Sequence, residues 1–122
     1  MTADEFGDLV ERLGPGVTRK PVLDTVQFRL GKKTFATLGW PAEGWAVIKL
    51  GLADQKAALA ASEAFAREPG RRRNSGVTLV RLRAADPAAL ADVLAAAWRH
   101  AYASAPRGGG QAAAARFGVE AA

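Results

Sequence analysis

Apolar residues recur at helical spacing near both ends of the chain. In residues 6–13 and 90–101 they return every three or four positions, a period that predicts two amphipathic helices. Thr2 and Glu5 have the spacing of a capping box ahead of the first of these helices. A third helix is expected over residues 55–67, shortly before a Pro-Gly pair.

Between the first and third helices the period changes to two. Polar and apolar residues alternate over residues 25–30, and two further apolar runs follow after short turns, so residues 25–52 are expected to form a three-stranded antiparallel meander. The run VTLVRLR, residues 77–83, predicts a fourth strand. Elements in the order αβββαβα predict an α+β fold, a two-layer sandwich with an antiparallel sheet and the helices on one face.

The composition is that of one soluble domain. A chain of 122 residues, 49% apolar and 24% charged, is long enough for one hydrophobic core. We expect residues 1–103 to form that domain and residues 104–122, rich in Gly and Ala, to be a tail. The chain lacks Cys, its first residues are acidic, and no apolar stretch approaches the roughly 20 residues of a membrane span, so a cytoplasmic protein is expected. The sequence does not give the oligomeric state, and a monomer is assumed.

Positive charge is clustered along the chain. The net charge is +5 and the pI about 10.2. Residues 1–14 hold four carboxylates and one Arg, whereas residues 19–33 hold five Lys or Arg against one Asp, and residues 67–83 hold six Arg against one Glu. Clustered Lys and Arg are the usual footprint of an anionic partner. The alternative is a basic surface that only keeps the chain soluble.

Strand alternation predicts that several of these cations share the sheet face away from the helices. If the apolar positions of each strand point inward, the intervening cations point outward together with Trp45, which suits phosphates and one stacked base. The hairpin turn at residues 31–33 and the loop GRRRNSG at residues 70–76 add further cations. The expected nucleic-acid-binding residues are Arg29, Lys32, Lys33, Lys49, Arg71, Arg72, Arg73, Arg81 and Arg83. Alternatively, Trp45 and Leu79 cover a partly buried second face while the charged side chains reach water.

Three stretches, FRLGKKTFATL, WAVIKLG and GVTLVRLRAADPAALADVLAAAWRHAYASAP, follow one another between residues 28 and 106. In this order and spacing they resemble the MmcQ/YjbR family. The resemblance spans roughly residues 3–106 and implies a CyaY-like fold and a role as a double-wing DNA-binding protein. The chain departs from many members at Gly76 and Val77, which stand where a tryptophan is frequent.

These features favour a non-enzymatic domain that binds DNA weakly and with little sequence preference, and that needs no cofactor. His100 has no carboxylate nearby in sequence to orient it as a base, and Ser62 and Ser75 lie outside any nucleophile motif. We therefore expect no catalytic residues.

Two other functions remain open. A protein-protein adaptor for an acidic partner would use the same basic surface. Metal binding of the frataxin type would use Asp4, Asp8 and Glu11, which lie at i, i+4 and i+7 on one helix, although no metal site is expected.

Overall fold

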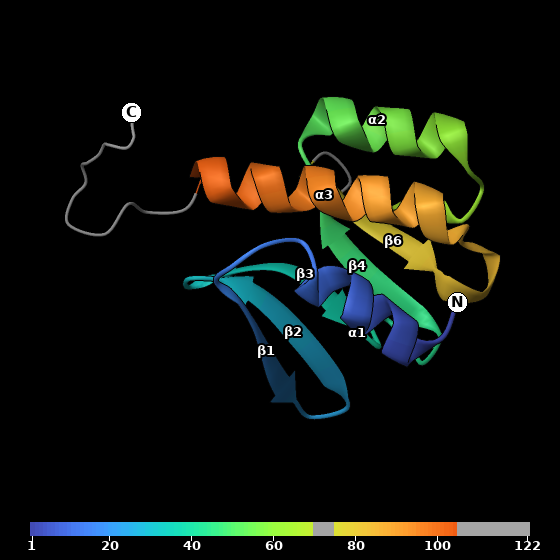
Figure 1. Ribbon diagram of the computed structural model, residues 1–122. Helices are drawn as coiled ribbons and strands as arrows, with labels where there is room; N and C mark the ends of the chain where they lie inside the picture. Colours follow the sequence, from blue (N-terminus) through green and yellow to red (C-terminus); the bar gives the residue numbers. More distant parts are fainter. Residues whose placement is uncertain (70–74, 105–122) are drawn as a thin grey trace.

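The computed structural model describes residues 1–69 and 75–104, which build a sheet covered on one face by helices (Figure 1). In chain order the elements are α1 (Ala3–Glu11), β1 (Val17–Val22), β2 (Thr25–Leu30), β3 (Lys33–Leu38), β4 (Trp45–Lys49), α2 (Leu52–Ala61), β5 (Phe65–Arg67), β6 (Val77–Arg81), the 3₁₀ turn η2 (Leu82–Ala84) and α3 (Pro87–Ser104). The described strands form one sheet in the order β1-β2-β3-β4-β6-β5, and all its pairs are antiparallel. The predicted α+β two-layer sandwich is confirmed.

The sheet contains two strands that the sequence did not predict. β1 precedes the expected meander, and β5 occupies residues that were assigned to the end of the third helix. That helix, α2, starts at Leu52 with Gly51 as its N-cap, and ends at Ala61. Ser62 has extended backbone, and its hydroxyl accepts a hydrogen bond from the Ala64 N–H at 3.1 Å, so the chain leaves the helix there and continues into β5.

The capping box predicted for the first helix is confirmed. The Thr2 hydroxyl accepts the Glu5 N–H at 3.1 Å, and the Glu5 carboxylate accepts the Thr2 N–H at 2.8 Å, which completes the capping box. The Thr2 backbone N–H, and after it the Thr2 hydroxyl, hold the pKa of Glu5 below its usual value. At α3, Asp86 accepts the Ala89 N–H at 3.0 Å.

The core lies between the helices and one face of the sheet. Figure 1 shows α3 crossing in front of the strands, with α1 and α2 on either side of it. Phe6 of α1 meets Phe28 of β2 edge-on, with ring centroids 6.0 Å apart. The large apolar side chains that are fully buried are Phe6, Val10, Phe28, Phe35, Ile48, Leu50, Val80, Leu90 and Leu94.

A β-bulge interrupts the pairing of β2 with β3. Phe28 pairs with Ala36, but the next residue, Arg29, pairs with Thr34, so β3 carries one residue more than its partner. Phe35 and Ala36 are both buried in the core, and Thr34 and Thr37 on either side of them both face away from the helices. The bulge therefore allows both threonines to point to the face of the sheet that the helices leave uncovered.

Candidate nucleic-acid interface

The sheet face away from the helices, called here the outer face, follows from strand register. Phe28, Ala36 and Ile48 lie in one row across β2, β3 and β4 and are buried beneath the helices. The neighbouring row, Gln27, Thr37, Val47 and Leu79, therefore points to the opposite side, because side chains alternate along a strand. The alternation expected for β2, β4 and the first five residues of the predicted fourth strand is correct.

Cations from several strands gather on the outer face. Arg29, Lys49 and Arg81 all take outward positions, as predicted. Lys20 of β1 pairs with Gln27 and joins them, a contribution that sequence reasoning missed together with β1 itself. No outward position within the described strands holds Asp or Glu, but Glu68, the residue after β5, lines a depression on this face. Since neighbouring strands lie about 4.8 Å apart, these cations are spread across the sheet rather than stacked at one point.

Two predicted site residues lie elsewhere. Arg83 does not share the outer face, because β6 ends at Arg81 and the chain turns into η2. Lys33 pairs with Leu30, which packs against the core, so Lys33 belongs to the helix side of the hairpin end. Lys32 lies in the exposed turn beside it. Arg71, Arg72 and Arg73, the centre of the loop GRRRNSG, lie outside the described residues.

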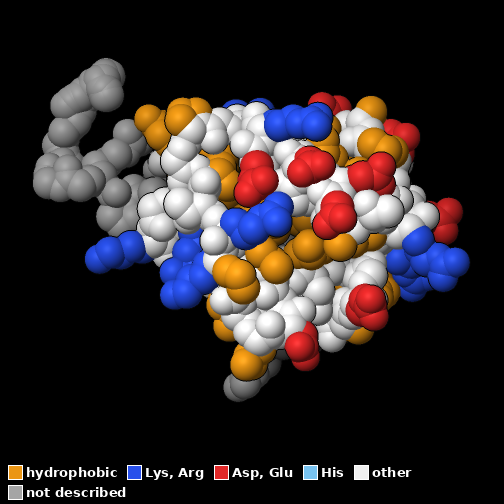
Figure 2. Space-filling model, turned by 60° about the horizontal axis from the view of Figure 1, so that its bottom comes forward, with side chains coloured by type: hydrophobic (Ala, Val, Ile, Leu, Met, Phe, Trp, Pro, Cys, Tyr) orange, Lys and Arg blue, Asp and Glu red, His pale blue; other side chains and the backbone are white. Residues whose placement is uncertain are grey.

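Carboxylates concentrate on the helical layer. Figure 2, in which the bottom of Figure 1 comes forward, shows acidic side chains gathered over α1. The exposed carboxylates of α1 are Asp4, Glu5, Asp8 and Glu11. Glu11 pairs with Arg19 of β1 at 3.3 Å, and the Arg19 guanidinium also lies 5.3 Å from the Phe28 ring centroid, which holds this cation on the helix side. The two layers therefore carry opposite charge.

The aromatic residue expected to stack a base on the outer face is partly covered. The Arg81 guanidinium lies 4.9 Å from the centroid of the Trp45 ring. On the same side of β6, Val77 is 5% exposed and Leu79 is 9% exposed, so this part of the outer face is apolar and shielded, as the alternative interpretation expected. Trp40, in the loop between β3 and β4, is 43% exposed, and only its flanking Gly and Pro marked it in the sequence as a loop residue.

The outer face is hollowed at its centre. A depression of about 390 Å³, the outer hollow, is lined by Thr25, Gln27, Thr34, Thr37, Trp40, Val47, Glu68 and Val77. Its lining is mixed, with threonine hydroxyls, the Gln27 amide and the Glu68 carboxylate around two valines and the Trp40 ring. The Gln27 carbonyl oxygen accepts hydrogen bonds from Arg29 Nη2 at 2.7 Å and from Arg29 Nε at 3.2 Å, so the amide is held in one orientation.

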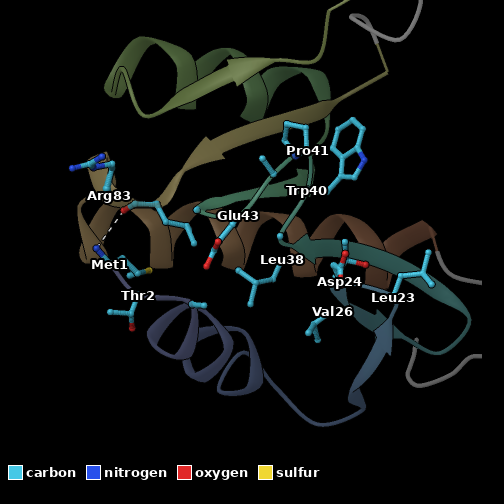
Figure 3. Close-up of a pocket in the computed structure, with 16 residues that line it drawn as sticks. Met1, Thr2, Leu23, Asp24, Val26, Leu38, Trp40, Pro41, Glu43 and Arg83 are labelled. Carbon is cyan, nitrogen blue, oxygen red and sulfur yellow. Dashed lines mark hydrogen bonds between the residues drawn. The ribbon is translucent and has the colours of Figure 1, made fainter.

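A larger groove lies at the end of the sheet, between the N-terminal residues and the loops that follow β1 and β3. It has a volume of about 930 Å³. Figure 3 shows the Glu43 carboxylate directed into it between Met1 and Leu38, while Trp40 points away. Asp24 adds a second carboxylate to its lining. The N-terminal ammonium of Met1 and the Arg83 side chain line the same groove, so its two carboxylates are matched by two cations.

Other candidate chemistry in the described residues is limited. The hydroxyls of Ser62 and Ser75 accept hydrogen bonds from nearby backbone N–H groups, those of Ala64 and Val77. Within residues 1–69 and 75–104, no three His, Asp or Glu side chains gather closely enough to hold a metal ion. No helix in this part of the chain is both long enough and apolar enough to cross a bilayer.

Comparison with protein-family models, with curated proteins and with solved structures finds no match to this chain in any of the three.

Proposed function

We propose that the chain is a non-enzymatic nucleic-acid-binding domain, with DNA as the expected ligand, and that the outer face of its sheet is the contact surface. The observation that carries the proposal is the separation of charge between the layers. Outward strand positions hold four cations, Lys20, Arg29, Lys49 and Arg81, and although Glu68 lines the same face after β5, α1 carries four carboxylates. A polyanion is attracted to the first surface and repelled by the second.

Binding through this surface is expected to be weak and dependent on salt. If these four cations neutralise about four phosphates of a duplex, log K falls with log salt at a slope of about −3.6, which is roughly a 10²-fold loss of affinity between 50 and 200 mM. A twisted sheet face with no protruding helix has little means of reading base edges in the major groove. The proposal therefore includes little preference for duplex sequence.

A salt series tests the proposal. Fluorescence anisotropy with a labelled 20-base-pair duplex of mixed sequence is measured for the wild type and for the triple variant Arg29→Gln, Lys49→Gln, Arg81→Gln. Because each phosphate contact contributes about 0.9 to the slope, the triple variant is expected to bind weakly, with a slope smaller by about 2.7.

The matched control carries Arg12→Gln, Lys56→Gln and Arg99→Gln. These three cations are exposed on the helical layer, and their replacement changes the net charge by the same amount. The control is expected to keep the wild-type slope. If both triple variants lose affinity equally, the interaction is generic attraction to a basic protein and the outer face is not the site. If DNA fails to bind at 50 mM salt while an acidic polypeptide such as poly-glutamate binds, the surface serves an acidic protein instead.

A further inference from the structure

We infer that the outer hollow receives one unpaired base, so that the surface prefers single-stranded over duplex DNA. The inference rests on the proposed function and names its substrate class. With a volume of about 390 Å³, the hollow lies at the small end of ligand pockets, which range over about 300–1,000 Å³. Such a space suits a planar ring of one nucleotide rather than a length of double helix.

The polar groups of the hollow are suited to the edge of a base. Arg29 donates two hydrogen bonds to the side-chain carbonyl oxygen of Gln27, and Thr34 Oγ1 lies 3.5 Å from the same oxygen. No described residue accepts a hydrogen bond from the Gln27 amide nitrogen, and Thr37 also lines the hollow. The hollow thus offers a fixed N–H₂ donor and a hydroxyl, the Glu68 carboxylate also lines it, and Val47 and Val77 provide an apolar floor.

Trp40 supplies an aromatic face at the edge of the hollow. It is 43% exposed and lines the outer hollow. The other two tryptophans are already engaged, since Trp45 lies beneath Arg81 at 4.9 Å and Trp98 stacks on Tyr102 with ring centroids 5.3 Å apart in α3. Trp40 is therefore the tryptophan with a ring available to a base, and base stacking on an aromatic ring contributes to affinity whatever the base.

Only an unpaired base can reach this position without cost. In a duplex the ring faces are stacked on neighbouring pairs, and a base must be flipped out, which costs a few kcal/mol. In a single strand the ring is already accessible, and the cations at Arg29 and Lys49 flank the hollow where the adjoining phosphates would lie. The same four cations then give a salt slope of about −2.8, smaller than that for a duplex.

The test compares a labelled 12-nucleotide single strand of mixed sequence with the duplex of the same sequence, in 50 mM salt. The variants are Trp40→Leu, which removes the ring, and Trp40→Phe, which keeps one. Wild type is expected to bind the single strand more tightly than the duplex. Trp40→Leu is expected to weaken single-strand binding about tenfold and leave duplex binding unchanged, and Trp40→Phe to restore most of the loss.

The control is Tyr102→Leu, which removes a ring that is 51% exposed from the helical layer and is expected to change neither affinity. Equal binding of both DNA forms, without an effect of Trp40→Leu, overturns the inference and leaves the proposed function in place. A loss of both affinities in Trp40→Leu also overturns it, because the ring then does not distinguish the two forms. If neither form binds to the wild type, the proposed function and the inference are overturned together.

Discussion

Arg81 and Trp45 are register partners across the β4–β6 pair, and the guanidinium lies 4.9 Å from the centroid of the indole ring. Both side chains stand on the outer face, so the cation is positioned by an aromatic ring rather than by a carboxylate. Because the contact is to the ring, it uses none of the N–H donors of the guanidinium group.

This contact is expected to stabilise the fold by about 0.5–1 kcal/mol, the usual size of a cation–π pair at an exposed site. A double-mutant cycle with Arg81→Gln and Trp45→Leu, followed by urea unfolding, measures it as the coupling free energy. If the effects of the two single substitutions on the free energy of unfolding simply add, the two side chains are close but do not stabilise each other.

Gly76 cannot carry a side chain. Its φ is +85°, and a Cβ atom would overlap the carbonyl oxygen of Leu50, whose N–H donates to the Gly76 carbonyl at 2.9 Å. Gly76→Ala is therefore expected to lower the free energy of unfolding well beyond the 1–2 kcal/mol or so that a left-handed conformation costs an alanine.

Gly44→Ala is the matched control. Gly44 has φ of +88°, but a Cβ atom there meets nothing within 4 Å, so this variant is expected to lose only about 1–2 kcal/mol. If urea unfolding shows the same decrease in the free energy of unfolding for both variants, the overlap at Leu50 is contradicted.

Gln55 links α2 to β6 by hydrogen bonds inside the core. Its side chain is buried, and its amide nitrogen donates to the Val77 carbonyl at 3.1 Å and to the Thr78 hydroxyl at 3.0 Å. Gln55→Leu is expected to cost about 1–3 kcal/mol in thermal or urea unfolding, because a buried hydroxyl loses its donor. In a Thr78→Val background the same change should cost less, and an undiminished cost there would argue against the hydrogen bond.

The capping box makes the start of α1 sensitive to acid. The folded pKa of Glu5 lies below its unfolded value, so its contribution to stability is complete above the unfolded pKa and is lost as the pH falls through the folded pKa. Carbon-13 NMR of the Glu5 carboxyl is expected to show titration below about pH 4.3, the ordinary value for Glu.

Thr2→Val separates the two causes of this shift. Since the backbone N–H of Thr2 is the larger cause and survives the substitution, the pKa of Glu5 should rise only part of the way toward its ordinary value. A Glu5 pKa that is ordinary in the wild type would contradict the capping box in solution.

The outward positions of Lys49 and Arg81 could be predicted because the neighbouring inward positions, such as Ala46, Ile48 and Val80, are apolar and make the alternation visible. The outward position of Lys20 could not be predicted from the sequence. In VTRKPV, an inward position holds Arg19, whose charge is balanced by Glu11 and by the Phe28 ring, contacts that depend on the tertiary fold.

The sequence also could not show where some of the strands and helices end. Phe65 and Ala66 fit the helical spacing of α2, and nothing local shows that Ser62 will instead accept the Ala64 N–H. Arg83 fits the alternation of β6, but the strand ends two residues earlier. Trp40 could be placed in a loop from its neighbours, whereas its position beside the outer hollow depends on the bulge in β3 and on the packing of the sheet.

Because β3 has one extra residue at its bulge, the strand could be one residue shorter there. Because Phe35 and Ala36 both point inward, a chain that lacked Ala36 would return to simple alternation with Phe35 still in the core and with Thr34 and Thr37 still outward. The two threonines would then be next-but-one neighbours on a straighter strand. Such a deletion would also remove the Ala36 side chain from the core, so it would change the contour of this surface at the cost of one buried methyl group.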